Sequence, residues 1–165
     1  MLAACESSNG GASGTSAAGV ASTASAPATS ATGDGGPAGG QTASATTTEV
    51  RAEAVKGGGS VVTDGAGATL YRYDKDRPNP SRWTCAGECV KTWIPVIVPD
   101  SVRTVGVEKS LLGTVHRDGR KQLTLGGWPL YRYVGDTGAG QVNGQGKDGR
   151  WYAVAPGGGK SDVTG

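Results

Sequence analysis

The stretch Leu70-Tyr71-Arg72-Tyr73 recurs as Leu130-Tyr131-Arg132-Tyr133, and an aspartate, Asp76 or Asp136, stands three residues after each copy. The chain has only five tyrosines, so a tetrapeptide and an aspartate in the same register indicate an internal repeat, one structural unit used twice. Alternate residues of a strand face the same side. We therefore expect the two tyrosines of each copy to share one face of a strand, with Leu and Arg on the other.

The residues around both copies have the composition of strands joined by turns. Turns rich in Asp and Gly, at 64–67 and 126–127, each stand between two runs of β-branched and aromatic residues, and a third turn is expected at Arg117-Asp118-Gly119. One short helix is expected at 86–93. The sequence predicts an all-β domain, a small sandwich or barrel built from two related hairpin repeats. The expected strands are 59–63, 68–74, 113–116, 121–125, 128–134 and 150–155.

Composition divides the chain near Arg51. Between Glu6 and Glu49 nearly every residue is Ala, Gly, Ser or Thr, without aromatic residues, Leu or Ile, so burial could not offset the cost of ordering this segment. We expect four parts: a remnant of a lipoprotein signal at 1–5, a disordered tether at 6–50, a β domain at 51–157 with repeats 58–99 and 105–157, and a flexible tail at 158–165.

The N-terminal residues Met1-Leu2-Ala3-Ala4-Cys5 look like the lipobox of a bacterial lipoprotein. Small residues before the cysteine suit a signal peptidase, and the Cys5 thiol would accept a diacylglycerol whose chains anchor the protein. No apolar run reaches the length needed to span a bilayer. The sequence thus predicts a domain outside the cytoplasm, attached to the cell membrane through lipidated Cys5.

The charge of the domain is mildly positive. From Arg51 onward, sixteen Lys and Arg stand against eleven Asp and Glu, which gives a net charge of +5, and the basic residues are spread along the chain. This pattern does not favour nucleic acid as a partner. It is compatible with an anionic cell-wall polymer or an envelope protein, and we expect a monomer.

Cys85 and Cys89 are spaced for a disulfide bond across one turn of chain. Export favours oxidation, so a structural disulfide is the main interpretation. The alternative is a soft-metal or redox site that binds copper(I), with His116 as the one available nitrogen ligand.

Asp76 and Asp136 allow two interpretations. Two carboxylates brought together could serve a hydrolase acting on a wall polymer. Alternatively, each aspartate stands where a strand enters a loop, and its side chain could bond nearby backbone N–H groups as an Asx-turn. Two copies of one motif supply similar environments, whereas an acid and a base need different ones, so we assign no catalytic residue and expect no cofactor.

Several segments together resemble the bacterial secreted repeat lipoproteins that are defined by a Tyr-x-aromatic-x-x-Asp motif and whose function is not established. Tyr71 to Asp76 and Tyr131 to Asp136 both fit that motif. The resemblance implies an extracytoplasmic location and a repeated architecture, and it supplies no catalytic residue. The further matching segments are Cys85 to Pro95, Gly127 to Tyr131 and Asn143 to Gly146.

The function expected from the sequence is a lipid-anchored structural or ligand-binding module of the bacterial envelope that is not an enzyme. The alternatives are a copper- or redox-active envelope protein using Cys85 and Cys89, and a wall-polymer hydrolase using Asp76 and Asp136. Tryptophans and tyrosines such as Trp83 would either pack in the core or stack on a ligand.

Overall fold

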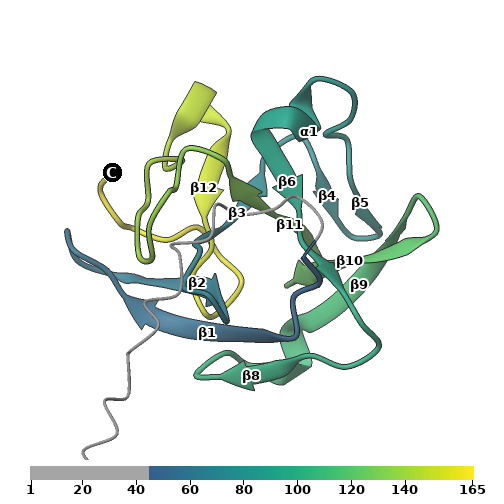
Figure 1. The fold of residues 1–165 in the computed structure, drawn as a ribbon, viewed down its shortest axis with the longest axis horizontal. Coiled ribbons are helices and arrows are strands. Elements are labelled where there is room, and N and C mark those ends of the chain that lie inside the picture. Colours follow the sequence, from purple (N-terminus) through teal and green to yellow (C-terminus); the bar gives the residue numbers. More distant parts are fainter. Residues whose placement is uncertain (1–44) are drawn as a thin grey trace, which may run out of the picture. The chain divides into compact units, whose positions relative to one another are not determined.

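The computed structural model describes residues 45–165. These residues form mainly β-strands with almost no helix, which confirms the all-β prediction. The helical parts are α1 (Cys89–Thr92) and two 3-10 turns at Lys109–Leu111 and Lys147–Gly149. The strands are β1 (Glu49–Ala54), β2 (Ser60–Asp64), β3 (Leu70–Tyr73), β4 (Arg77–Pro78), β5 (Ser81–Arg82), β6 (Trp93–Pro95), β7 (Ile97–Val98), β8 (Arg103–Val105), β9 (Leu112–Arg117), β10 (Arg120–Leu125), β11 (Trp128–Tyr133) and β12 (Trp151–Ala153) (Figure 1).

The two copies of the repeated tetrapeptide lie side by side. They form β3 and the main part of β11, which pair antiparallel with Tyr71 opposite Tyr131. On the outer edge of β3, Trp151 of β12 pairs with Tyr73, and on the other side of β11, Trp93 of β6 pairs with Tyr133. The order β12-β3-β11-β6 is therefore symmetric about the central tyrosine pair, and β6 corresponds to β12.

The strands that precede the two repeated strands, β2 before β3 and β10 before β11, diverge from them a few residues from the connecting turn. β10 pairs with β11 only at two positions beside the turn, and then with β9 and β7. The expected strands and turn of the first hairpin are present, but one antiparallel bridge, Thr63 to Thr69, is all that joins 59–63 with 68–74. β2 pairs along its length with β1 instead. β1 also pairs in parallel with β8. Within the described residues the ladders form three sheets, and none closes into a barrel.

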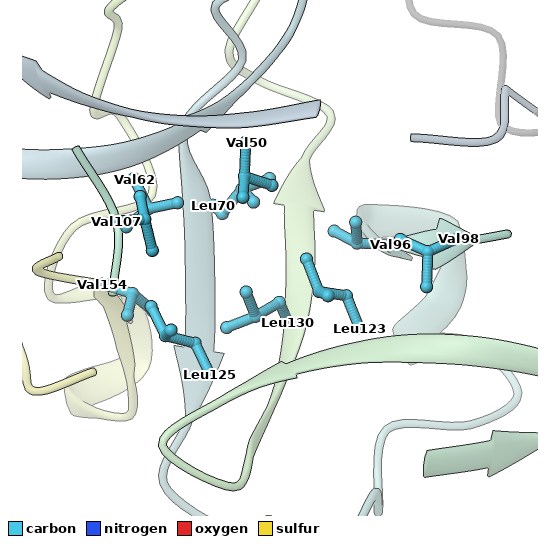
Figure 2. Close-up of a cluster of buried hydrophobic side chains, with 10 residues drawn as sticks. All are labelled: Val50, Val62, Leu70, Val96, Val98, Val107, Leu123, Leu125, Leu130 and Val154. Carbon is cyan, nitrogen blue, oxygen red and sulfur yellow. The ribbon is translucent and has the colours of Figure 1, made fainter. Parts of the chain in front are cut away.

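Alternation along β3 and β11 separates two buried clusters. Leu70 and Leu130 belong to an aliphatic cluster, whose side chains approach one another from several strands in Figure 2. Tyr71 and Tyr131 belong to the second cluster, against which Tyr73 and Tyr133 pack, together with further aromatic residues. The expected division of faces, tyrosines on one side and leucines on the other, is confirmed.

Both predicted boundaries of the domain need correction. Thr47 is buried and its N–H donates to the carbonyl of Ile97 (2.8 Å), so ordered chain begins before residue 51, in the part expected to be tether. The segment 158–165 was expected to be a flexible tail. Ser161 and Val163 are instead buried, and Val163 packs into the second cluster. The remainder of the tether, residues 6–44, and Cys5 with its lipobox lie outside the described residues.

In the part of the chain that the structure describes, no helix has the length and apolar character needed to cross a membrane.

Candidate functional site

The repeated tyrosine and aspartate bond across the two repeats. The Tyr71 hydroxyl donates to Oδ2 of Asp136 (2.6 Å), and the Tyr131 hydroxyl donates to Oδ2 of Asp76 (2.8 Å). All four side chains are buried. Each tyrosine thus binds the aspartate of the other copy, and we call these four residues the tyrosine–aspartate lock.

The second oxygen of each aspartate holds a loop of its own repeat. Oδ1 of Asp76 accepts hydrogen bonds from the backbone N–H (2.7 Å) and the hydroxyl (2.8 Å) of Thr84. Oδ1 of Asp136 accepts from the backbone N–H of Asn143 (2.9 Å). The expected Asx-turns are wrong, because these donors lie well beyond the two-residue reach of such a turn. The carboxylates instead close two long loops at equivalent positions, Thr84 and Asn143.

Burial sets the protonation of the lock. Burial raises the pKa of both phenols far above the usual value, and the adjacent carboxylates raise it further, so Tyr71 and Tyr131 remain hydrogen-bond donors. Burial also raises the pKa of Asp76 and Asp136, and the hydrogen bonds from the tyrosines and loops oppose that rise. For both carboxyls burial is the largest effect and the pKa shift has the same direction, although the charge of Arg117 also acts to lower the pKa of Asp76. Shifts in the same direction differ from the divided pKa values that acid–base pairs use.

The outer tyrosine of each copy ends a stack of four rings. Trp93 and Trp151 stack at the centre, with ring centroids 3.8 Å apart and planes 4° apart. Tyr73 stacks on Trp151 at 4.1 Å, and Tyr133 lies tilted on Trp93 at 4.7 Å. The two tryptophans are buried, so these rings belong to the core.

Cys85 and Cys89 form a disulfide bond, with Cα atoms 5.4 Å apart. His116 lies exposed on β9, and its main-chain carbonyl accepts a hydrogen bond from the Trp83 indole N–H (2.9 Å). Among residues 45–165, no three His, Cys, Asp or Glu side chains gather as they would around a metal ion. The structure therefore does not assemble Cys85, Cys89 and His116 into a metal site.

A hollow of about 350 Å³ lies beside the disulfide loop. Arg117, only 5% exposed, is placed on its wall: the guanidinium lies 4.2 Å from the centre of the Trp83 ring and donates to Gln122 Oε1 (3.1 Å) and to the Cys85 carbonyl. No local sequence pattern predicts this position of Arg117, because its partners come from two segments distant from each other, 83–85 and 122. The hollow is lined by Trp83, Ala86, Gly87, Val90, Ile94, Pro95, Arg117, Asp118 and Arg120.

Comparison with known proteins assigns both halves of this arrangement to one family. The family model described as a secreted repeat of unknown function matches residues 54–97 and again residues 113–155. Each matched segment contains one Leu-Tyr-Arg-Tyr strand and one aspartate of the lock. No curated protein and no solved structure matches the chain. The chain therefore belongs to the family of secreted repeats of unknown function and carries two copies of the repeat.

Proposed function

We propose that this extracytoplasmic module is a non-enzymatic binding domain of the bacterial envelope, held at the cell membrane by a lipid on Cys5. The tyrosine–aspartate lock carries the proposal. Its four polar side chains are buried and bonded to one another, which leaves them to hold the two repeats together rather than to act on a substrate. The hollow beside the disulfide loop supplies the accessible aromatic and cationic groups that a binding site needs.

The alternatives have less support. A hydrolase needs one carboxyl with access to its substrate and another in a different environment, whereas Asp76 and Asp136 are both buried in equivalent bonds. Copper(I) binding needs free thiolates, and Cys85 and Cys89 are joined to each other. No observation on the described residues favours either function over binding.

Site-specific photo-crosslinking on living cells tests the binding function. A photoreactive amino acid replaces Ala86, which is exposed at the edge of the hollow, and in a matched control it replaces Ala54, an exposed alanine of β1. We expect a crosslinked adduct from position 86 that is weak or missing at position 54. Equal adducts at both positions, or none at either, would contradict a binding function at the hollow.

Metabolic labelling tests the anchor. Cells that express the full-length gene product with labelled fatty acid should incorporate the label into this protein, and Cys5→Ser should abolish incorporation and release the protein from the membrane fraction. Label that persists in the Cys5→Ser variant would disprove the anchor, and it would leave the crosslinking result unaffected.

A further inference from the structure

The C-terminal segment 160–165 occupies a groove along the outer edge of β12, on the side away from β3. The Ser161 N–H donates to the Ala153 carbonyl (2.8 Å), and the Ser161 hydroxyl donates to the Ser60 carbonyl (2.8 Å). The Gln145 amide donates to the carbonyls of Ser161 and Val163, both at 3.1 Å, and Val163 is buried beneath. Here the chain binds its own extended peptide by addition to a strand edge. In Figure 1 this yellow segment runs beside β12.

The symmetry of the repeats places β6 where β12 stands in the other half. Pro95 pairs with Tyr131 as Ala153 pairs with Tyr71. The next residues also correspond: Val96 N–H donates to the Leu130 carbonyl and Val154 N–H to the Leu70 carbonyl, both at 3.0 Å. Since N–H and C=O groups alternate in direction along a strand, the Pro95 carbonyl points away from β11, as the Ala153 carbonyl points away from β3.

The walls of the two grooves correspond as well. Thr84 and Asn143 occupy equivalent positions after the lock, and Leu123 and Val62 donate equivalent hydrogen bonds to Val96 and Val154, which fixes the alignment. The tail lies against nine residues: Gly57, Gly59, Ser60, Asp74, Val142, Gln145, Tyr152, Ala153 and Val154. Their counterparts are Asp118, Arg120, Lys121, Val134, Trp83, Ala86, Ile94, Pro95 and Val96. Six of these nine, all but Lys121, Val134 and Val96, line the hollow.

The chemistry of the hollow differs from that of the occupied groove in a way that indicates its ligand. Trp83 and Ile94 replace Val142 and Tyr152, which gives a broad apolar floor. At the rim, Arg120 replaces Gly59. Two arginines against one aspartate among the lining residues favour an acidic group.

We propose that the hollow and the outer edge of β6, together the β6 groove, bind an extended peptide segment of a partner protein whose backbone N–H donates to the Pro95 carbonyl. The Trp93 N–H donates to the Cys89 carbonyl and Pro95 has no N–H, so this edge presents carbonyl acceptors to the peptide. An aliphatic side chain of this peptide lies over Trp83 and Ile94, and an acidic side chain lies at Arg120. The proposal rests on the binding function above and names its partner class. Its basis is that the corresponding groove of the same chain already holds a peptide, with Val163 as the buried aliphatic residue.

A titration of the ¹⁵N-labelled full chain, followed by NMR, tests this. The probe is a synthetic peptide of residues 157–165, and a second peptide carries Ser161→Asp, because Ser161 lies beside Gly59, the counterpart of Arg120. In the intact chain the β12 groove is filled by its own tail at high effective concentration, so the added peptide reports on the β6 groove. We expect saturable shifts of the Trp83 indole and the Ile94 amide, with the acidic peptide binding about two- to fivefold more tightly.

Two matched variants sharpen the test. Methylation of the peptide nitrogen that corresponds to Ser161 should weaken binding by roughly two- to tenfold, because the hydrogen bond to the Pro95 carbonyl is lost. Arg120→Glu should remove the preference for the acidic peptide, whereas Arg150→Glu, at another exposed arginine, should keep it.

Several outcomes would overturn the proposal: shifts confined to β12 and the tail, no shift at Trp83 with millimolar peptide, or equal binding of the methylated peptide. Shifts at Trp83 caused by wall-polymer fragments and not by peptides would also overturn it. In that case a crosslink from position 86 would still support the binding function, so the two failures are distinguishable.

Discussion

At the scale of single residues, the two halves of the lock are not equal. The Tyr71 hydroxyl also accepts a hydrogen bond from the Gly144 N–H (3.2 Å), and Asp136 depends on Tyr71 and Asn143 for its bonds. Asp76 keeps two bonds from Thr84 when Tyr131 is removed. The lock is therefore more vulnerable at Tyr71.

Removal of each hydroxyl tests this inequality. Tyr71→Phe leaves the Asp136 carboxyl and the Gly144 N–H short of a partner, so it should lower the free energy of unfolding by about 2–3 kcal/mol, against about 1 kcal/mol for Tyr131→Phe. Tyr152→Phe, which removes an exposed hydroxyl bonded to the Gly149 carbonyl, is the control and should change little. Denaturant unfolding measures all three, and an equal or greater loss for Tyr131→Phe would contradict the assignment.

The lock also predicts a pH dependence. Burial raises the pKa of Asp76 and Asp136 in the folded state, so the stability linked to their protonation is present below the ordinary carboxyl pKa and is lost as the pH rises through the raised values. A variant carrying Asp76→Asn and Asp136→Asn has no carboxyl to ionise at these positions, so it does not lose this stability as the pH rises. Its stability relative to wild type should therefore be greater at pH 7 than at pH 4 in urea unfolding. A relative stability that falls between pH 4 and pH 7 would show that the carboxyl pKa values are lowered instead.

At the scale of elements, the disulfide closes the loop that leads from the lock to α1. The loop is short, so chain entropy predicts a stabilisation of only about 2 kcal/mol. The double variant Cys85→Ala with Cys89→Ala should lose about this much and should not respond to reductant, whereas the wild type should fall to a similar midpoint on reduction. A wild-type unfolding midpoint that is insensitive to complete reduction would show that the bond contributes nothing to stability.

Local patterns predicted some elements and missed others for physical reasons. The β9–β10 hairpin forms at the expected turn, where Asp118 and Gly119 both take positive φ (48° and 74°). The main partner of β2 is β1, which was not predicted, because an apolar run specifies which face is buried and not which strand lies next to it. β1 was missed, since Glu49–Ala54 lies where the composition of the tether gives way to that of the domain.

At the scale of the whole molecule, the site could be predicted only in part. The sequence identified Tyr71, Asp76 and their repeats. It did not show that each tyrosine bonds the aspartate of the other copy, because the bonded residues are more than fifty positions apart and meet only through the antiparallel pairing of β3 with β11. The burial of the C-terminal tail could not be predicted either. Its few apolar residues form no strand or helix pattern, and Val163 is buried only because the folded domain provides a groove along β12.

The tail itself gives a prediction at this scale. Val163→Ala should lower the free energy of unfolding by roughly 1–2 kcal/mol, because it removes buried methyl groups from the second cluster. Thr164→Ala, at the exposed neighbour, should have little effect. Hydrogen exchange should also quicken at the Ser161 N–H in the Val163→Ala variant. Unchanged stability and exchange would mean that the segment contributes nothing to the fold in solution.

Through the tyrosine–aspartate lock, the repeated motif joins one repeat to the other. A double-mutant cycle measures this directly, with Tyr71→Phe combined with Asp136→Asn in one cycle and with Asp76→Asn in the other. The bond from Tyr71 to Asp136 predicts a coupling energy of about 1 kcal/mol or more for this pair, and below about 0.5 kcal/mol for Tyr71 with Asp76. Strong coupling of Tyr71 to Asp76 of its own repeat, with none to Asp136, would show that the lock does not join the two repeats.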